Sequence, residues 1–493
     1  MNACGKSDAC VVPGKQSNND RVNRSAEIVE ERRETKGNTM PSATPRTQRR
    51  KSLSPGLHRV RKAAREGKDV RFTALLHHVT PEALRESFNA LKRQSAPGVD
   101  GVTWAQYRKG LDERLTDLHK RLLAGSYRAQ PSRRVHIPKP DGRTRSLGIA
   151  ALEDKIVQHA VGQVLSVIYE EDFLGFSYGF RPGRGQHDAL DALFVSLTRK
   201  KVNWVLDADI KGFFDAISHE WMVKFVEHRI ADPRVIRLVR KWLRAGVSED
   251  GKWSETRVGT PQGAVISPLL ANIYLHYVLD QWVHHWRRTK ADGDVTIVRY
   301  ADDFVIGFQH RRDANNFLAA LKTRLEKFCL TLNTEKTRLL EFGRFAAENR
   351  RKRGAGKPET FDFLGFTHIC ALTRKCGRFH VIRKTVKKRL RATLAKVKEI
   401  LRARMHDPIG EVGAWLQRVV YGYYRYHAIS GNMKTMNTLQ MEITRYWLKT
   451  LRRRGQKRRI NWQKFGPIAR KWVPAPKVYH PYPNVRFYAK YPR

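Results

Sequence analysis

The chain has 493 residues, of which 41% are hydrophobic, so it can bury globular cores of ordinary size and is not a disordered polymer. Its 95 Lys and Arg residues against 47 Asp and Glu residues give a formal net charge of +48, an excess that repels itself unless a polyanion neutralises it. Five scattered cysteines exclude a disulfide framework, and the lack of a long apolar run excludes a membrane span, which together favour a soluble protein of a reducing compartment that binds nucleic acid.

The N-terminal 69 residues are predicted to be a disordered basic tail. No aromatic residue occurs before Phe72, and Ser, Asn, Arg and Lys dominate the first 56 residues, so this stretch lacks the apolar surface needed to fold alone. Residues 58 to 70 nevertheless have a helical and basic pattern. We expect the folded body to begin near residue 70.

Short β-type runs alternate with amphipathic helices from residue 70 to about residue 342. In VTIVRYADDFVIGF, residues 295 to 308, two apolar segments are joined through Asp302 and Asp303, which predicts a hairpin with two acids at its tip. Residues 204 to 210 form another apolar strand, whose two-residue period places Asp207 and Asp209 on one face.

Acids from separate strands that meet at one place repel one another unless divalent cations lie between them. That arrangement is used for phosphoryl transfer with two metal ions. An Asp-Asp pair taken alone, however, is more often an ordinary turn than a metal site. The metal hypothesis therefore depends on the segments that accompany Asp302 and Asp303.

The C-terminal third begins with an expected loop or insertion at residues 348 to 357, followed by a hairpin over residues 361 to 383 and then by helices. Hydrophobic residues recur on one helical face from Val386 to Leu401, and nearly all the charges off that face are positive. We expect this helix to pack on one side and to offer cations to a polyanion on the other. The candidate RNA-binding residues are Lys387, Lys388, Arg391 and Arg425.

Two further patterns leave alternatives open. The tyrosines around Arg425, at positions 421, 423, 424 and 426, either stack on bases or belong to a helix core. His368, Cys370, Cys376 and His380 have the residue types of a zinc site, but the spacing between the two cysteines is longer than usual, so zinc is not expected.

Seven segments occur in a particular order along the chain. They are IPKPDGRTRSLGI (137–149), GFRPGRGQHDAL (179–190), DADIKGFFDAI (207–217), GTPQGAVISPLLANIYL (259–275), RYADDFVIG (299–307), LTLNTEKTRLL (330–340) and FDFLGF (361–366). Together they resemble the sequence blocks of group II intron-encoded reverse transcriptases over roughly residues 90 to 366. YADD alone is a weak match, whereas the ordered series is specific.

The resemblance implies an α+β fold, a right-hand polymerase with fingers, a palm built on an antiparallel sheet and a helical thumb, followed by a mainly helical maturase region. The expected divisions are residues 1–69 for the N-terminal tail, 70–205 for an N-terminal extension and the fingers, 206–366 for the palm, 367–475 for the thumb and maturase region, and 476–493 for a basic aromatic C-terminal tail.

The same resemblance assigns roles to single residues. Asp209, Asp302 and Asp303, with the backbone carbonyl of Ile210, would hold two Mg²⁺ ions, and Asp207 stays unassigned. Lys336 would act as the acid that protonates the pyrophosphate leaving group.

Nucleotide and template contacts are also implied. Lys139 and Arg145 would grip the incoming triphosphate, and Phe214 would select dNTP substrates by blocking a ribose 2′ hydroxyl, although without the family it would be taken for a core residue. Gln262 would lie beside the templating base pair. Arg181 and Tyr300 are expected at the template and primer.

The function implied is that of an RNA-directed DNA polymerase encoded by a group II intron. It would bind its intron RNA, assist splicing and copy the intron from an RNA template with a DNA primer into target DNA during retrohoming, as a cytoplasmic bacterial ribonucleoprotein. Residues 413 to 432 match the maturase region more loosely. No cysteine follows Cys376, so a C-terminal endonuclease with paired cysteines is expected to be absent and the primer to be made elsewhere.

Two alternatives stay open. One is an RNA-binding splicing cofactor with a vestigial polymerase, and the other is a reverse transcriptase adopted by another system. The oligomeric state, target site and intron subclass do not follow from the sequence.

Overall fold

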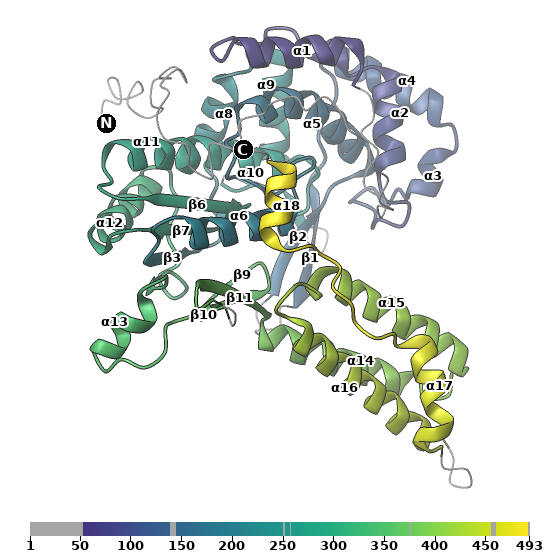
Figure 1. The fold of residues 1–493 in the computed structure, drawn as a ribbon. Coiled ribbons are helices and arrows are strands. Elements are labelled where there is room, and N and C mark those ends of the chain that lie inside the picture. Colours follow the sequence, from purple (N-terminus) through teal and green to yellow (C-terminus); the bar gives the residue numbers. More distant parts are fainter. Residues whose placement is uncertain are drawn as a thin grey trace.

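The computed structural model describes residues 53–138, 144–249, 252–256, 258–373, 376–454 and 460–491, and the side chain of Arg145 also lies outside the description. Helices surround a central antiparallel sheet, and a long helical bundle extends away from it (Figure 1). This arrangement confirms the expected α+β class. Within the described residues, no helix combines the length and the apolar character needed to cross a membrane.

The central sheet has the strand order β6-β7-β3-β8, with every neighbouring pair antiparallel. It confirms the predicted hairpin over residues 295 to 308, whereas the strand predicted over residues 204 to 210 is shorter and ends at Ala208. The strands are β3 (Trp204–Ala208), β6 (Val295–Tyr300), β7 (Asp303–Phe308) and β8 (Arg338–Glu341).

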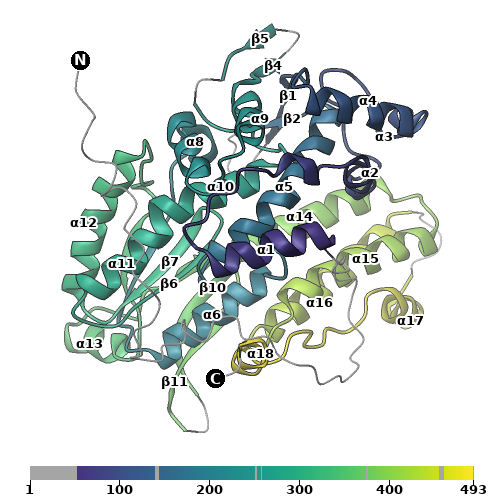
Figure 2. The same cartoon turned by 90° about the horizontal axis from the view of Figure 1, so that it is seen from above.

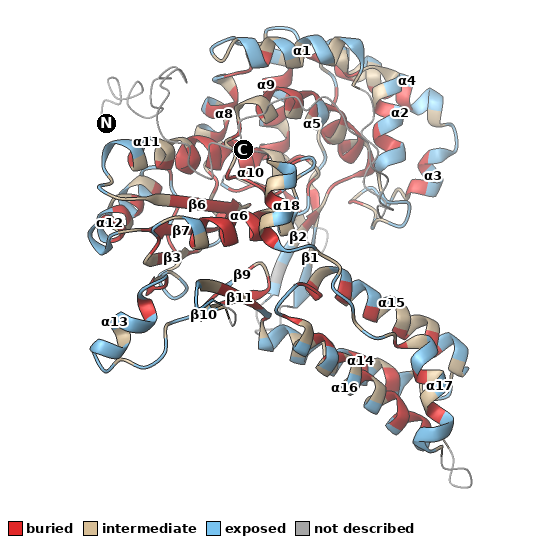
Figure 3. Ribbon diagram, in the orientation of Figure 1, coloured by how far each residue is buried: buried red, intermediate tan, exposed pale blue. Residues whose placement is uncertain are grey.

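Both faces of this sheet are buried, because successive side chains of a strand point to opposite sides. Leu206 and Phe304 join one hydrophobic core, whereas Val205 and Val305 join a second core on the other face. Two-sided burial explains why these strands are nearly continuous apolar runs in the sequence. Figure 3 shows this burial through the central strands and the helices beside them.

Helices and a small sheet cover the two faces. The first core contains residues of α5 (Leu152–Asp172), α10 (Ser267–Leu275), α11 (Gln281–Thr289) and α12 (Arg311–Lys327), with a π-helical turn at His276–Asp280. The second core contains residues of α6 (Gln186–Arg199) and of the sheet β11-β10-β9, formed by β9 (Phe361–Phe363), β10 (Phe366–Leu372) and β11 (Phe379–Thr385). The predicted hairpin over residues 361 to 383 is thus confirmed and gains a third strand.

A second four-stranded sheet, of order β2-β1-β4-β5, stands beside the N-terminal helices. Its strands are β1 (Ser132–Pro138), β2 (Thr144–Ile149), β4 (Val247–Glu249) and β5 (Lys252–Ser254). The other helices of this half are α1 (Pro55–Glu66), a 3-10 turn at Leu76–His78, α2 (Pro81–Ala90), α3 (Trp104–Arg108), α4 (Leu111–Leu123), α7 (Phe213–Ala216), α8 (His219–Glu227) and α9 (Pro233–Arg244).

The C-terminal bundle has its own hydrophobic core. In its first helix Val397 and Leu401 are buried while Lys387 and Lys388 are exposed, which confirms the predicted amphipathic helix. The bundle helices are α14 (Lys387–Ala403), α15 (Ile409–His427), α16 (Met433–Arg452) and α17 (Trp462–Trp472).

The N-terminal segment requires a correction, since part of the predicted disordered tail is folded as helix α1 (Pro55–Glu66), in the region where residues 58 to 70 have a helical pattern. Helix α1 lies along α5 (Figure 2). Arg61 Nε contacts Glu171 Oε1 at 2.8 Å, and the buried Arg229 donates to the carbonyl oxygens of Gly67 and Val70 at 3.0 and 2.7 Å. These partners are more than 100 residues away in sequence, so local composition does not reveal them. Residues 1–52 lie outside the described part of the chain.

The C-terminal segment and the expected loop at residues 348 to 357 also differ from prediction. Helix α18 (Pro483–Lys490) returns to α6, where Phe487 is buried and Lys490 Nζ contacts Asp188 Oδ2 at 2.7 Å. Helix α13 (Ala346–Lys352) occupies the first part of the expected loop. The other predicted boundaries stay predictions, although those after residues 205 and 366 fall within strands β3 and β10.

Arg299 of β6 ties the central sheet to the helices behind it. Its side chain is fully buried and donates to Asp280 Oδ1 at 2.7 Å, Asn272 Oδ1 at 3.1 Å and Ser177 Oγ at 2.7 Å. It also donates to the carbonyl oxygen of Ala301 at 2.9 Å, within the turn between β6 and β7. A buried charge of this kind is stable only while its partners remain.

We predict that Arg299→Ala lowers the free energy of unfolding by about 3 to 5 kcal/mol, because the Asp280 carboxylate would stay buried without its cation. Thermal and urea unfolding of the purified protein measure the change. Arg288→Ala, which removes an exposed arginine from α11, is the control and should leave stability nearly unchanged. Equal unfolding midpoints for Arg299→Ala and Arg288→Ala would contradict the role of the buried pair.

Candidate active site

Three aspartates meet where β3 ends and β7 begins. The register pairs Ala208 with Phe304, so its continuation places Asp209 opposite Asp303, and Asp302 belongs to the turn just before β7. By the two-residue period, Asp209 and Asp303 lie on the same face of the sheet as Val205 and Val305. The backbone pairing therefore brings together the acids that the sequence singled out.

The turn that carries Asp302 is held in a particular shape. Ala301 has φ 57°, in the left-handed region that residues with a side chain rarely adopt. Gly179 lies against it so closely that a Cβ atom at Gly179 would be 2.3 Å from the Ala301 nitrogen. Together with the hydrogen bond from Arg299, this contact holds the turn in place.

Burial and the neighbouring acids act together on Asp303. Loss of hydration among the surrounding protein atoms, together with the carboxylates of Asp302 and Asp209, raises the pKa of Asp303 to about 6, even though the residue keeps contact with solvent. A raised carboxyl pKa means that the surroundings disfavour the ionised form. A bound cation would relieve this repulsion.

Lys336 forms an ion pair with Asp209. Its Nζ lies 2.8 Å from Asp209 Oδ2, and Asn333 Nδ2 donates to the same oxygen at 3.1 Å. The segment is fixed by a backbone bridge between Ile210 and Leu332, whose hydrogen bonds use the carbonyl of Asp209 and the amide of Lys211. The Ile210 carbonyl therefore takes no part in the hydrogen bonds of this bridge.

The donor set suits hard divalent cations, because Asp209, Asp302 and Asp303 offer carboxylate oxygens and Ile210 offers a carbonyl oxygen. In the side-chain arrangement of the described residues, however, no three His, Cys, Asp or Glu side chains are placed to hold a metal ion together. Because Lys336 and Asn333 both contact Asp209 Oδ2, a metal ion at that oxygen would compete with the ammonium group of Lys336.

Asp207 has a different partner. Its carboxylate Oδ2 lies 3.3 Å from Arg338 Nη2, on the neighbouring strand β8, and the two residues are paired in the sheet register. Burial raises the pKa of Asp207 to about 6 in spite of this arginine. An ion pair within the sheet accounts for Asp207 without a role in metal binding.

Phe214 and Gln262 are linked through one loop. The amide of Thr260 donates to the Phe214 carbonyl at 2.8 Å, and the amide of Gly148 in β2 donates to the Gln262 carbonyl at 2.7 Å. Gly263 has φ +115°, which favours glycine, and a Cβ there would be 2.9 Å from the Gly148 oxygen. The loop thus connects the helix that follows Asp209 with the strand that contains Arg145.

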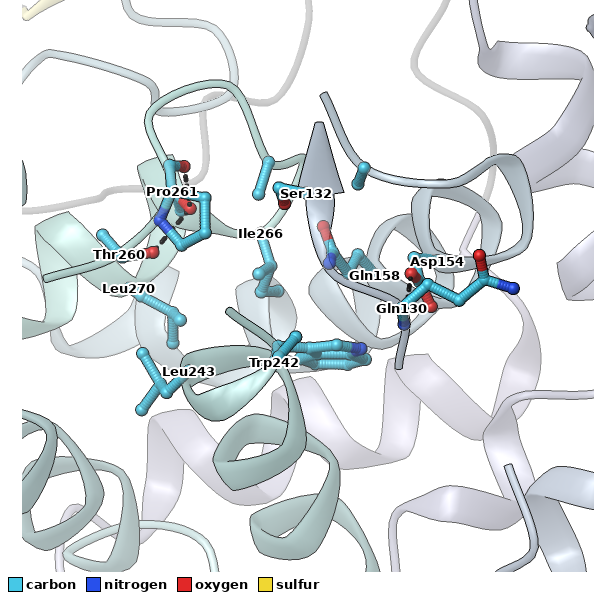
Figure 4. Close-up of a pocket in the computed structure, with 14 residues that line it drawn as sticks. Gln130, Ser132, Asp154, Gln158, Trp242, Leu243, Thr260, Pro261, Ile266 and Leu270 are labelled. Atoms are coloured by element: carbon cyan, nitrogen blue, oxygen red, sulfur yellow. Dashed lines mark hydrogen bonds between the residues drawn. The ribbon is translucent and has the colours of Figure 1, made fainter. Parts of the chain in front are cut away.

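A small cavity lies behind this loop, on the side of α5 and α9 (Figure 4). In its wall the hydroxyls of Thr260 and Ser267 are hydrogen-bonded at 2.7 Å, and Ser267 Oγ donates to the Pro261 carbonyl at 3.1 Å. These contacts support the loop from behind. The cavity therefore belongs to the scaffold of the site, and Asp209, Asp302 and Asp303 are not among its lining residues.

Two predicted triphosphate contacts are not tested by the structure. Lys139 and the side chain of Arg145 lie outside the described residues, although the backbone of Arg145 pairs with Ile137 in the hairpin of β1 and β2. Tyr300 pairs with Asp303 across the turn and is half-buried, and burial raises the pKa of its hydroxyl. Of these three residues, only Tyr300 is placed beside the aspartates.

The prediction for Arg181 is wrong. Its side chain is fully buried and donates to Glu170 Oε2 at 3.1 Å, to the Leu174 carbonyl at 2.7 Å and to the Ser177 carbonyl at 2.8 Å. These bonds make it a structural anchor rather than a template contact. The neighbouring Phe180, which sequence reasoning missed, is 53% exposed.

The candidate RNA-binding residues all lie on the surface of the bundle. Exposed side chains are found at Lys387, Lys388 and Arg391 of α14 and at Arg425 of α15. Of the tyrosines near Arg425, Tyr424 is buried in the bundle core, so the helix-core interpretation holds for that residue.

The residues considered for zinc have other contacts. The buried His368 stacks on Phe361 with 4.7 Å between ring centroids, and Cys376 Sγ lies 3.1 Å from the hydroxyl of Thr373. Cys370 Sγ lies 3.8 Å from the Gly343 carbonyl oxygen, to which it donates.

Comparison with known proteins identifies relatives of this chain. The family model described as reverse transcriptase (RNA-dependent DNA polymerase) matches residues 137–368. Protein YkfC of Escherichia coli K12 is 37% identical over 270 residues, covering 48% of this chain and 71% of YkfC. The group II intron-encoded protein LtrA of Lactococcus lactis is 35% identical over 229 residues, covering 46% of this chain and 38% of LtrA.

One solved structure, a telomerase from Candida albicans in complex with a fragment of telomeric RNA, aligns with a TM-score of 0.40 and 12% identity. The alignment covers 71% of this chain and 63% of the telomerase chain.

We predict that Lys336→Ala strengthens the binding of Mg²⁺ to the protein by about twofold to fivefold, the free energy of one exposed ion pair. The ammonium group of Lys336 would no longer compete with the cation for Asp209. Isothermal titration calorimetry of the protein with Mg²⁺ measures the affinity. Arg338→Ala, which breaks the adjacent pair with Asp207, is the control and should change the affinity less. Weaker Mg²⁺ binding by Lys336→Ala would contradict the competition.

Proposed function

This chain belongs to the family of group II intron-encoded reverse transcriptases and is an RNA-directed DNA polymerase, and from that premise we propose that it joins nucleotides by two-metal transfer at Asp209, Asp302 and Asp303. The observation that carries the proposal is the strand register, which sets Asp209 opposite Asp303 beside the turn of Asp302. Burial, together with the neighbouring carboxylates of Asp302 and Asp209, raises the pKa of Asp303 to about 6, which supports the binding of a cation there.

The three aspartates and the Ile210 carbonyl would hold two Mg²⁺ ions, which supply an activated primer 3′ hydroxyl and neutralise the charge of the triphosphate. The residues around them would do the rest. Lys336, whose Nζ is 2.8 Å from Asp209 Oδ2, would give a proton to the departing pyrophosphate. Lys139 and Arg145 would bind the triphosphate of the dNTP.

Phe214 and Gln262 would set the fit of the new base pair. Phe214 accepts a backbone hydrogen bond from Thr260 of the loop at residues 259–263, and Gln262, within that loop, accepts one from Gly148 of β2, which limits the movement of both residues. Phe214 would exclude a ribose 2′ hydroxyl by its bulk, and Gln262 and Tyr300 would lie against the base pair and the primer. A rigid support of this kind favours selection between similar substrates.

The bundle would bind the intron RNA, assist its splicing and hold it while the intron is copied into target DNA during retrohoming. A formal net charge of +48 and the exposed Lys387, Lys388, Arg391 and Arg425 support binding to a polyanion. The name of LtrA, a group II intron-encoded protein, supports an intron RNA as that polyanion. The proposed setting is a ribonucleoprotein in the bacterial cytoplasm.

We predict that Asp302→Ala reduces extension of oligo(dT) on a poly(rA) template with Mg²⁺ by more than about a hundredfold, because loss of a direct ligand should exceed the 10- to 100-fold effects of outer-sphere partners. Binding of the template and primer should persist. Asp207→Asn, which changes the neighbouring acid paired with Arg338, is the control and should extend the primer at a near-normal rate. Equal incorporation by wild type and Asp302→Ala would refute the assignment.

Copying and splicing should be separable. A variant with glutamine at positions 387, 388, 391 and 425 is expected to lose support of intron splicing and to show a shallower dependence of intron RNA affinity on salt, since fewer counterions are released. Its extension of oligo(dT) should remain. Asp302→Ala should show the reverse pattern, splicing without copying. A protein that splices but never copies, even as wild type, would be an RNA-binding splicing cofactor instead.

A further inference from the structure

Phe180 is in an unusual state for a phenylalanine. Its φ is +60°, in the left-handed region that is costly for a bulky side chain, and 53% of the residue is exposed to solvent. Phenylalanine is normally buried, and a left-handed position is normally occupied by glycine or asparagine. Backbone preference and hydrophobic burial therefore both fail to explain a phenylalanine here.

Its two neighbours in sequence force this conformation. Gly179 has no room for a side chain, because a Cβ atom would lie 2.9 Å from the Tyr300 carbonyl carbon and closer still to Ala301. The Gly179 carbonyl accepts a hydrogen bond from Asn272 Nδ2 at 2.7 Å. On the other side, Arg181 is anchored by its buried guanidinium to the carbonyls of Leu174 and Ser177. Strained residues persist where flanking structure fixes them in this way, and they cluster at functional sites.

The same contacts place Phe180 beside the catalytic acids. Gly179 packs on the Tyr300–Ala301 peptide, and Asp302 is the next residue of that turn. The preceding residues are joined to β6 by the bridge between Ser177 and Arg299 and by the hydrogen bond from the Tyr178 amide to the Arg299 carbonyl. The exposed ring thus emerges next to the turn of Asp302, on a segment fixed to that turn.

An exposed aromatic ring beside acids in a strongly basic protein suits one kind of ligand. Nucleobases and sugars present flat or apolar faces, and stacking on aromatic rings tolerates any base sequence. A hydrophobic protein partner would instead need a contiguous apolar surface. Phe180 stands between Gly179, which is buried, and Pro182 and Gly183, which offer no large side chain, so such a surface is lacking along this segment.

We propose that Phe180 is a nucleic-acid-binding residue whose ring stacks on a nucleotide of the template–primer duplex next to the aspartates. The inference rests on the proposed copying of a template–primer and deepens it by replacing Arg181 with Phe180 as the contact in this segment. The strained backbone positions the ring before the nucleic acid arrives. The ring contributes to nucleic-acid binding, and the left-handed backbone conformation of Phe180 lowers the stability of the folded protein.

Phe180→Gly separates these two effects. Glycine adopts the left-handed conformation without strain, so the midpoint of thermal unfolding should stay unchanged or rise. The affinity for a fluorescent RNA template–DNA primer hybrid, measured by anisotropy without divalent ions, should fall by about fivefold to a hundredfold, the range for loss of one base–aromatic stack. Phe180→Tyr keeps a ring and should bind almost as tightly as wild type.

Cys329→Gly is the matched control. Cys329 is also exposed with φ +59°, at the C-terminal end of α12, so its replacement relieves comparable strain without removing a ring. It should raise the unfolding midpoint and leave hybrid affinity unchanged. The inference fails if Phe180→Gly binds the hybrid as wild type does, or if it unfolds at a clearly lower temperature, which would make the ring a packing residue. The proposed function fails separately if wild type itself extends no primer.

Discussion

Mutual repulsion of three carboxylates, imposed by strand pairing, is the constraint around which this structure is organised. Asp209 and Asp303 are opposite each other because β3 and β7 are antiparallel neighbours. Asp302 lies beside them because it is the residue of the turn directly before β7. Such repulsion opens a loosely held hairpin. Here the sheet is buried on both faces, and Arg299 and Gly179 hold the turn from behind, so the acids cannot separate.

The response of the side chains to this constraint is uneven. Asp209 pairs with Lys336, Asp207 pairs with Arg338, and burial together with the neighbouring acids raises the pKa of Asp303 to about 6. Asp209 thus has a cation that a metal ion would replace, and a cation beside Asp303 would favour the ionised form of its carboxyl group.

Much of this site follows from the sequence, because it depends on local patterns. Period-two runs predicted β3 and the hairpin of β6 and β7, and the ordered motifs predicted which acids meet. The helical period likewise predicted the buried and exposed sides of α14.

What the sequence did not reveal depends on long-range contacts. Helix α1 is held by Glu171 and Arg229, and α18 by Asp188, none of which is near in sequence. The burial of Arg181 and the exposure of Phe180 have the same origin. An arginine in a basic protein is expected on the surface and a phenylalanine in the core, but the contact of Gly179 with Ala301 and the buried partners of Arg181 reverse this order.

The most direct measurement of the central claim is the anomalous scattering of Mn²⁺ in crystals of the protein with an RNA template, a DNA primer and a non-hydrolysable dNTP analogue. We predict manganese peaks in contact with the carboxylates of Asp209, Asp302 and Asp303, with the 2.8 Å contact between Asp209 and Lys336 opened. Manganese bound only to the nucleotide, with Asp209 still in contact with Lys336, would contradict metal binding by the three aspartates.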